Sequence, residues 1–275
     1  MSKAFKPRRS VLFVPGSDPE KLERARSLSC DVVVLDLEDS VAPENKDMAR
    51  DMVCAAIRNY PGREVVVRIN AAPSPWARAD LAAVTNARPD AVLLPKVERA
   101  TDITVTGAAV AVWAMIETPL AVLHLAEIAA SGAACLVLGS NDLLKAMQAQ
   151  PLSDRHNLWA VMTQTVIAAR AHGLCVLDGT HNDIGDLDGF ADACAQARAF
   201  GFDGKTLIHP LQIMPCNRAF APSLDEIAQA RRIIDAFAAA PGKGAIALDG
   251  RMIERLHVEE AQRLLALAQA IEGRA

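Results

Sequence analysis

The sequence predicts an α/β fold, a (β/α)8 TIM barrel with a C-terminal helical extension. Two observations support this prediction. Short apolar β-type runs alternate with helix-type stretches along most of the 275 residues, and eight such runs can be counted. The runs are rich in Val, Leu and Ile without polar alternation, which is typical of parallel strands buried on both faces. Eight βα units in about 210 residues fit a closed barrel, although periodicity alone leaves an open doubly wound sheet as the alternative.

The elements follow in order along the chain. The predicted strands occupy residues 10–15, 31–39, 64–70, 91–96, 111–117, 135–142, 173–179 and 204–210. Ser17-x-x-Glu20 and Ser223-x-x-Glu226 have the spacing of capping boxes, which open helices. Residues 1–222 are therefore predicted to form the catalytic barrel. Residues 223–275 are predicted to form a helical extension and lid segment within the same domain, ending in an amphipathic helix.

Composition excludes several classes of protein. Hydrophobic residues make up 51% and charged residues 23% of the chain, which excludes a disordered protein. Lys and Arg number 29 against 33 Asp and Glu, a net charge of −4, and no basic block is present, which argues against nucleic acid or a membrane surface as partner. Six scattered cysteines without a CxxC pair indicate reduced thiols, and no run resembles a signal or membrane-spanning segment. We therefore expect a cytoplasmic protein with a small-molecule ligand.

Polar residues close nearly every predicted strand. In a parallel barrel the carboxyl ends of the strands form the active-site face, so these residues are expected to meet at one mouth. In chain order they are Gly16, Glu38 and Asp39, Arg68 and Asn70, Lys96 and Glu98, Glu117, Asn141 and Asp142, Asp178, and His209.

Glu117 and Asp142 end neighbouring predicted strands. Two buried carboxylates that lie close together repel each other unless a divalent cation lies between them. Oxygen ligands alone favour Mg²⁺, with Mn²⁺ as the other possibility, and leave coordination positions for water and substrate oxygens. The two residues are therefore predicted to be metal ligands, with a solvated or singly protonated pair of acids as the alternative.

Two further groups are candidates for binding a negatively charged substrate. Arg68 closes an otherwise apolar strand, and its planar guanidinium suits an oxyanion or a carboxylate; a structural ion pair with Glu38 or Asp39 is the alternative. Gly16 lies at a predicted helix N-terminus, with Arg9 upstream and Lys21 on the helix. Backbone N–H groups and basic side chains there are predicted to bind an anion, although such a short motif is often only a turn.

Seven motifs, taken together and in order, resemble the citrate lyase beta-subunit family. This family includes malyl-CoA and citramalyl-CoA lyases and lies within the HpcH/HpaI aldolase group. The resemblance covers nearly the whole chain. The motifs are RSVLFVPGS from Arg9, LDLEDSV from Leu35, VRIN from Val67, LPK from Leu94, MIET from Met115, GSNDL from Gly139 and GKTLIHP from Gly204.

The resemblance implies a barrel that binds Mg²⁺ and makes or breaks a carbon–carbon bond beside a thioester. It also implies a homo-oligomer, a trimer or a hexamer. Position by position, Glu117 and Asp142 match the metal ligands and Arg68 matches the substrate-binding arginine. Glu38 and Asp39 match the acidic pair that orders water and active-site groups.

Two further positions concern the substrate. The segment DGRMI from Asp249 resembles the C-terminal segment of the CoA-dependent lyases, whose aspartate enters a neighbouring subunit's site as an acid or base. His181 stands where the family pattern leads us to expect a tyrosine, at the rim of the mouth, so we expect it to contact the acyl group.

The predicted function is that of a lyase. We expect a reversible Claisen cleavage in which a malyl-CoA, citramalyl-CoA or citryl-CoA type of thioester gives a 2-oxo acid and an acyl-CoA. Two alternatives remain open from the sequence. The same site could hydrolyse a malyl-CoA thioester with water held by Glu38 or Asp39, or the barrel could be a non-catalytic subunit.

Overall fold

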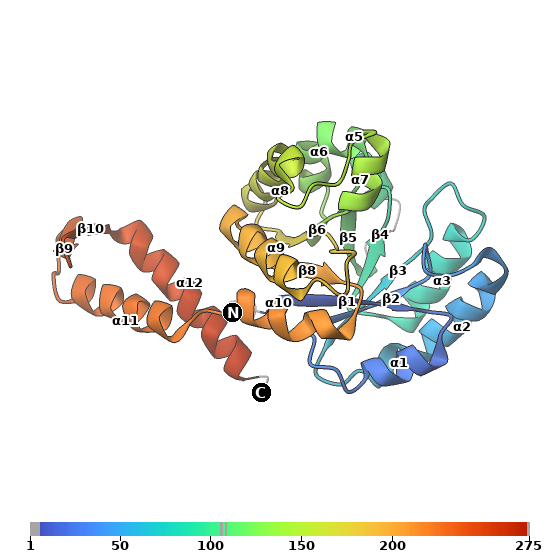
Figure 1. Cartoon of the computed structure of the whole chain (residues 1–275), viewed down its shortest axis with the longest axis horizontal. Coiled ribbons are helices and arrows are strands. Elements are labelled where there is room, and N and C mark those ends of the chain that lie inside the picture. Colours follow the sequence, from blue (N-terminus) through green and yellow to red (C-terminus); the bar gives the residue numbers. More distant parts are fainter. Residues whose placement is uncertain (1–5, 105–106, 108, 274–275) are drawn as a thin grey trace. The chain divides into compact units, whose positions relative to one another are not determined.

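The computed structural model describes residues 6–104, 107 and 109–273, and its main feature is a closed barrel of eight parallel strands in sequential order. Figure 1 shows the helices arranged around these strands. The barrel strands are β1 (Ser10–Pro15), β2 (Val32–Asp36), β3 (Glu64–Arg68), β4 (Ala91–Leu94), β5 (Ala111–Ile116), β6 (Cys135–Leu138), β7 (Cys175–Asp178) and β8 (Gly204–Leu207). The predicted (β/α)8 barrel is therefore confirmed.

Helices connect the strands and follow the last one. They are α1 (Pro19–Ala25), α2 (Lys46–Ala56), α3 (Ala77–Ala87), α4 (Ala100–Thr104), α5 (Pro119–Leu123), α6 (Leu125–Ala130), α7 (Ser140–Ala146), α8 (Trp159–Ala171), α9 (Leu187–Phe200), α10 (Ile213–Ala219), α11 (Leu224–Ala238) and α12 (Arg255–Glu272). Short 3-10 turns occur at η1 (Pro43–Asn45), η2 (Ile57–Asn59), η3 (His156–Leu158) and η4 (Pro210–Gln212). No helix in the described ranges is long and apolar enough to cross a membrane.

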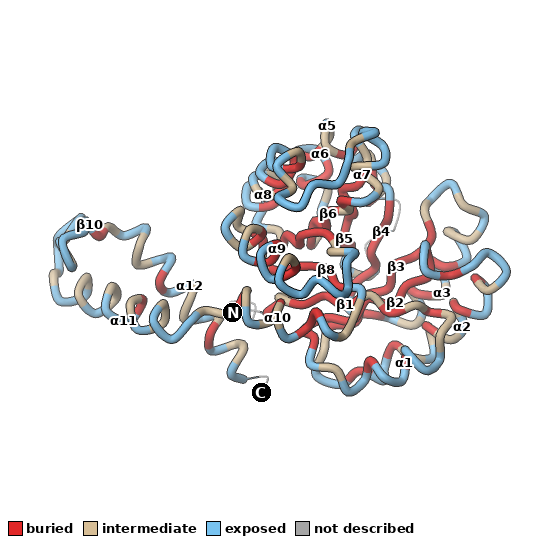
Figure 2. Tube along the Cα trace, viewed as in Figure 1, coloured by how far each residue is buried: buried red, intermediate tan, exposed pale blue. Residues whose placement is uncertain are grey.

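Alternate strand residues build two apolar layers. The smaller layer contains strand residues such as Val32, Val34, Val66 and Trp113, so it fills the barrel interior. The larger layer combines the intervening strand residues with buried residues of the surrounding helices. Figure 2 shows the strands as the most buried part of the barrel. Because side chains alternate along a strand, this division shows which polar residues point inward.

All eight predicted strands are observed, most of them with shorter carboxyl ends. The largest difference concerns the run predicted over 135–142, where β6 stops at Leu138 and α7 begins at Ser140. Asp142 therefore lies in the first turn of a helix, not at the end of a strand. The apolar run ends at Leu138, and the small and polar residues 139–142 that follow it mark the helix start, so the prediction carried the strand too far.

One predicted cap is confirmed and the other is wrong. The Ser223 hydroxyl accepts a hydrogen bond from Glu226 N at 3.1 Å, and the Glu226 carboxylate accepts one from Ser223 N at 2.7 Å. The cap of α1 is Asp18 and not Ser17, because the Asp18 carboxylate accepts from Lys21 N at 3.0 Å. Proline at the first helical position moved the start of the helix by one residue.

By its contacts the chain divides into two compact units, Arg8–Phe220 and a smaller unit that contains Ala221–Ala275 and the N-terminal residues up to Pro7. In the smaller unit, α11 and α12 flank an antiparallel hairpin of β9 (Ala245–Leu248) and β10 (Arg251–Glu254). Its two turn residues, Asp249 and Gly250, have φ of 52° and 74°. An Asp-Gly pair favours such a turn, so the hairpin was visible in the sequence although we predicted only helices there.

Candidate active site

Three charged residues lie on the inner face of the barrel near its carboxyl end. Asp36 continues the inward alternation of Val32 and Val34, and Arg68 continues that of Val66. Glu117 follows Trp113 and Met115 in the same way, one residue after β5. The alternation within three strands therefore brings these side chains to the mouth.

Arg68 has a bidentate partner that the sequence analysis missed. Its Nε and Nη2 donate to the two carboxylate oxygens of Asp36 at 2.6 and 2.7 Å. The predicted structural partners lie at Nη1, with Glu38 at 3.0 Å and Asp39 at 3.7 Å. The guanidinium also stacks on Phe13, 4.8 Å from the ring centre. Burial opposes the charge of Arg68, but the charge and hydrogen bonds of Asp36 raise its pKa above the usual value.

Asp36 could have been found from the sequence. It stands two residues after Val34 and four after Val32, on the face that the pattern assigns to the barrel interior. Burial alone would raise the pKa of Asp36, but the Arg68 charge and several hydrogen bonds bring it below its usual value. Asp36 is therefore ionised and neutralises much of the positive charge of Arg68.

Glu38 is a buried carboxyl group between two cations. Its Oε1 accepts from Lys96 Nζ at 2.9 Å, and its Oε2 faces Arg68 Nη1 at 3.0 Å but accepts no well-oriented hydrogen bond among the described residues. Burial raises the pKa of Glu38 despite both cations. Asp39 is the more exposed of the predicted acidic pair. Glu38 is therefore a buried carboxyl group held by two cations, with one oxygen that accepts no well-oriented hydrogen bond among the described residues.

Glu117 is almost fully buried, with 1% of its surface exposed. Burial raises its pKa to about 7, the charges of Glu38 and Asp142 act in the same direction, and a hydrogen bond from Lys96 N to Oε1 at 2.7 Å opposes them. Gly139 makes room for this side chain, since a Cβ at that position would lie 2.5 Å from Glu117 Oε2. A larger residue at position 139 would therefore displace the Glu117 carboxylate.

Glu117 and Asp142 fit a hard divalent cation. Both offer carboxylate oxygens, and the pKa of Glu117 is raised mainly by its burial and further by the charges of Glu38 and Asp142. Within the described ranges no group of three or more His, Cys, Asp and Glu side chains could hold a metal ion. Two carboxylates would leave the remaining coordination positions to water and substrate, as Mg²⁺ prefers.

Lys96 contacts both Glu117 and Glu38. Its backbone is left-handed, with φ of 51°, a conformation that costs a non-glycine residue about 1–2 kcal/mol. In this conformation its N–H binds Glu117 while its ammonium binds Glu38. Its position at the end of a predicted strand was noted in the sequence, but nothing there indicated the double contact.

The predicted anion site around Gly16 is not brought together. The Gly16 N–H is already donated to Asp36 O at 2.8 Å, and the Asp18 carboxylate occupies the start of α1 and pairs with Lys21 at 3.0 Å. Arg9 precedes β1 and binds Asp31 through two nitrogens at 2.8 and 2.9 Å. Arg9 therefore lies at the amino end of the barrel, about 20 Å along the strand from Gly16.

A family profile and two relatives place the chain. The sequence profile of the family described as HpcH/HpaI aldolase/citrate lyase matches residues 9–210. The chain belongs to this family. A relative from Cereibacter sphaeroides (strain KD131 / KCTC 12085) named (3S)-malyl-CoA thioesterase is 43% identical over 273 residues, covering 96% of each chain. Citrate lyase subunit beta of Escherichia coli (strain K12) is 32% identical over 282 residues, covering 95% of this chain and 93% of its own.

A solved structure shares both the fold and the sequence of this HpcH/HpaI family member. It is the protein CitE from Mycobacterium tuberculosis in complex with magnesium, acetoacetate and coenzyme A. The identity is 34%, the TM-score is 0.83, and the match covers 97% of this chain and 99% of that one. The resemblance to the citrate lyase beta-subunit family is therefore confirmed.

His181 and Asp178, which were also predicted to lie at the mouth, have different environments. His181 is half-buried against Phe190, with 5.8 Å between the ring centres, and burial lowers its pKa with help from the charge of Lys205. Its backbone oxygen accepts from Gln212 at 3.0 Å. Asp178 points outward and not into the mouth, because it continues the outer alternation of Val176. It pairs there with Lys205 at 2.6 Å and Arg155 at 2.8 Å.

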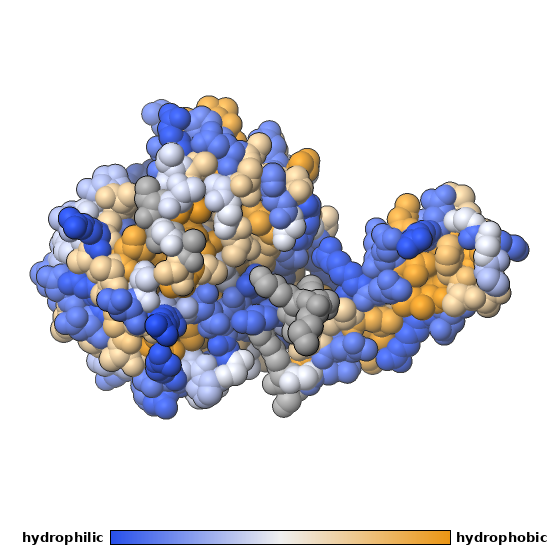
Figure 3. Space-filling view, turned by 180° about the vertical axis from the view of Figure 1, so that it is seen from behind, coloured by the Kyte–Doolittle hydropathy of each residue, from blue (hydrophilic) through white to orange (hydrophobic). Residues whose placement is uncertain are grey.

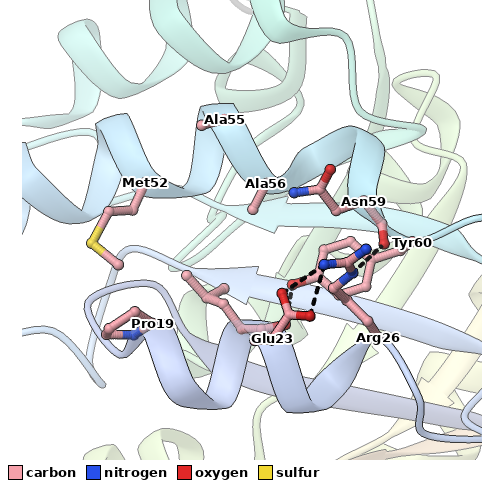
Figure 4. A pocket seen from close by; sticks show the side chains of 9 residues that line it. Pro19, Glu23, Arg26, Met52, Ala55, Ala56, Asn59 and Tyr60 are labelled. Carbon is pink, nitrogen blue, oxygen red and sulfur yellow. Dashed lines mark hydrogen bonds and ion pairs between the residues drawn. The ribbon is translucent and has the colours of Figure 1, made fainter.

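A separate pocket of about 260 Å³ lies between α1 and the end of α2 (Figure 4). Leu22, Met52 and Tyr60 are among its lining residues, and the ion pair of Glu23 and Arg26 lies beside them at 2.7 Å. None of the residues predicted to bind substrate or metal lines it. It therefore does not belong to the candidate active site.

Asp249 lies in the smaller unit, at the turn of the β9–β10 hairpin. Its carboxylate accepts two hydrogen bonds from Arg232 at 2.6 and 2.8 Å, and the side chain is half exposed. Its role as an acid or base for a neighbouring subunit stays a prediction, as does the lid role of the segment. Large apolar side chains such as Leu224 and Met252 are exposed in this unit, and apolar surface runs along the face visible in Figure 3.

Proposed function

We propose that this protein is a Mg²⁺-dependent thioesterase that hydrolyses a 2-hydroxyacyl-CoA of the (3S)-malyl-CoA type to the free acid and CoA. One observation carries the proposal. Glu117 and the Arg68 guanidinium are buried on the inner face of the barrel mouth, and Asp142 lies in the first turn of the helix that follows β6, the neighbour of β5. The 43% identity to a relative named (3S)-malyl-CoA thioesterase supports hydrolysis as the reaction.

Each residue has a task that follows from its contacts. Glu117 and Asp142 would hold Mg²⁺, which when bound polarises substrate oxygens and offsets the negative charge of the acid. Arg68 Nη1 points toward Glu38 and is the donor available for an oxygen that gains negative charge. Glu38 would orient a water for attack on the thioester carbonyl and accept its proton, because its buried Oε2 accepts no well-oriented hydrogen bond among the described residues.

Carbon–carbon cleavage, which the sequence analysis favoured, is the second candidate. It is supported by the 32% identity to a citrate lyase beta subunit and by the family to which the chain belongs. In that reaction a base removes the hydroxyl proton of the acid, and we propose Asp249 of a neighbouring chain for this step. The 2-oxo acid would leave first, and the thioester enolate would then take up a proton.

Separate detection of the products tests the two candidates. The protein is incubated with (3S)-malyl-CoA or citramalyl-CoA, with Mg²⁺ or with EDTA, and free thiol is measured apart from glyoxylate and pyruvate. Hydrolysis is expected to release thiol without a 2-oxo acid, and EDTA is expected to stop it. A 2-oxo acid without free thiol would establish the lyase instead, and no turnover of either thioester would reject both.

The proposed role of Asp142 as a metal ligand is tested by one further variant. Asp142→Ala is expected to fold normally, because the side chain is only half-buried and makes no hydrogen bond that holds the barrel together among the described residues. It is expected to lose turnover and the increase in thermal stability that Mg²⁺ gives the wild type. Near-normal turnover with EDTA present would reject the metal assignment.

A further inference from the structure

The carboxylate of Asp36 is the most heavily hydrogen-bonded group of the mouth. Only 1% of the residue is exposed, and it receives hydrogen bonds from Arg68, from the backbone of Glu38 and from Ser40. We propose that Asp36 is a positioning residue, which holds the Arg68 guanidinium in its working orientation and keeps Glu38 available for the reaction. This proposal rests on the proposed function of the site.

Asp36 and Arg68 fix the orientation of the guanidinium. The two residues are direct partners in the register of β2 and β3, and both point into the barrel. Asp36 takes Nε and Nη2 of Arg68 at 2.6 and 2.7 Å, and Phe13 covers one face of the guanidinium. Rotation about the side-chain bonds would break both hydrogen bonds at once. Nη1 is therefore left as the nitrogen directed at the other acids of the mouth.

Asp36 is itself held by the turn that follows β2. Its Oδ1 accepts from Glu38 N at 2.9 Å, and its Oδ2 accepts from Ser40 N at 3.1 Å and from the Ser40 hydroxyl at 2.5 Å. Lys46 binds the carbonyl oxygens of Leu37 and Glu38 at 2.8 and 2.6 Å from the other side of the turn. The turn after β2 thus holds the Asp36 carboxylate, and the Asp36 carboxylate in turn holds the Arg68 guanidinium.

Without Asp36, the Arg68 guanidinium is expected to form an ion pair with another acid. The side chain of Arg68 is largely buried, and a buried guanidinium needs a carboxylate partner. Glu38 at 3.0 Å and Asp39 at 3.7 Å are the acids that already approach Nη1. A bidentate pair with Glu38 would occupy the oxygen that we assign to water, and it would draw Nη1 away from the substrate.

The chain contains a matched control for the loss of such a pair. Asp31 precedes β2, at the opposite end of the strand from Asp36, and it too is buried and accepts two hydrogen bonds from an arginine, Arg9. Asp36→Asn and Asp31→Asn each remove the charge from a buried bidentate pair. A merely structural role predicts similar losses of stability and similar kinetics in the two variants.

The kinetics of the two variants test the proposal. With (3S)-malyl-CoA and Mg²⁺, kcat of Asp36→Asn is expected to fall about a hundredfold, the usual effect of misplacing a catalytic group by about 1 Å, while KM changes less than threefold. Asp31→Asn is expected to keep kcat within threefold of the wild type. Equal kcat values in the two folded variants would overturn the proposal.

A double-mutant cycle shows whether Asp36 acts through Arg68. In an Arg68→Ala background, Asp36→Asn is expected to lower kcat by less than threefold, because the group that it positions is absent. A further hundredfold loss in that background would overturn the proposal.

Crystal structures of the two variants give a result that does not depend on activity. In Asp36→Asn the Arg68 guanidinium is expected to leave Phe13 and pair with Glu38, whereas in Asp31→Asn it is expected to stay. An unchanged Arg68 in Asp36→Asn would overturn the positioning role. If the wild type turns over no thioester, the proposed function fails, and the structures alone still decide the role of Asp36.

Discussion

The side chains at the barrel mouth carry more negative than positive charge. Asp36 neutralises Arg68, and Lys96 pairs with Glu38, so among the described residues no cationic side chain pairs with the carboxylates of Glu117 and Asp142. The raised pKa of Glu117 is the direct result of its burial and of these neighbouring charges. The mouth is therefore less stable without a cation than with one.

Glu117→Gln is expected to stabilise the metal-free protein at high pH. The pKa of Glu117 is about 7 in the folded protein against an ordinary value of 4.5, so ionisation disfavours folding. The loss of folding free energy that the ionisation of Glu117 causes in the wild type is absent below about pH 4.5 and complete above about pH 7. Gln keeps the acceptor for Lys96 N, so the variant should gain roughly 3 kcal/mol at pH 8 and almost nothing at pH 4.5.

Urea unfolding of both proteins in EDTA measures this difference. Asp142→Asn is the comparison: it removes only the contribution of Asp142 to the pKa of Glu117, so it should recover a smaller part of the stability. Saturating Mg²⁺ should then raise the stability of the wild type and leave Glu117→Gln unchanged. Parallel stability curves for wild type and Glu117→Gln between pH 4.5 and 8 would show that Glu117 is not the group that titrates.

Arg68→Lys is expected to reduce kcat by about a hundredfold to a thousandfold, the usual effect of losing one donor to a developing negative charge. A lysine ammonium cannot occupy both oxygens of Asp36 and still reach the mouth, because it lacks the planar fork of arginine. Steady-state kinetics with the same thioester measure the change. Arg50→Lys is the control, since Arg50 also pairs with a buried acid, Asp80, at 3.1 Å. Similar kcat values for the two variants would argue against a role for the guanidinium in the reaction.

At the scale of the elements, one buried charge cluster joins β7 and β8 to the helix layer. Lys205 has 0% of its surface exposed and binds Asp178 and Gly179 O at 2.6 and 2.5 Å. Arg155 binds Asp178 and also Ala193 O and Gln196 of α9. These contacts explain why Asp178 can end β7 without facing the mouth of the barrel. The cluster fixes the outer packing of the barrel.

Asp178→Asn is expected to lower the free energy of unfolding by about 3–5 kcal/mol, because it leaves the buried Lys205 without an anionic partner. Asp249→Asn breaks an exposed pair with Arg232 and should cost less than about 1 kcal/mol. Urea unfolding at pH 7 compares the two. A loss for Asp178→Asn no larger than that for Asp249→Asn would show that Lys205 finds another way to satisfy its charge.

At the scale of the whole molecule, the barrel could be predicted because its signal is spread along the chain. Each strand is a short apolar run of its own, so errors of up to four residues at strand ends did not change the count or the order. The start of α7 was missed because the predicted strand was carried past Leu138 over the polar residues 139–142, which in fact open the helix. The hairpin of β9 and β10 was missed although the Asp249-Gly250 pair marks it.

The active site was predictable in part. Residues such as Arg68 and Glu117 close strands and are inward by alternation, which the sequence contains. The pairing of Asp36 with Arg68 depends on the register between β2 and β3, which periodicity does not determine. Arg9 was placed near Gly16 because the two are close in sequence, but a strand carries its two ends to opposite faces of the barrel.

The last prediction concerns the assembly. If Asp249 serves the site of a neighbouring chain, two inactive variants should restore activity when they share one oligomer. Glu117→Gln lacks a metal ligand of its own site, and Asp249→Asn lacks the group that it would lend. In a ring formed from equal amounts of the two, about one site in four has both groups intact, so about a quarter of wild-type activity is expected.

The activity of the mixed oligomer measures this. The two variants are co-expressed with different tags, the mixed oligomer is purified, and it is assayed with the thioester that the wild type uses. The two variants assembled separately are the control. A mixed oligomer without activity, alongside an inactive Asp249→Asn, would mean that Asp249 acts in the site of its own chain, and an active Asp249→Asn would remove it from the reaction.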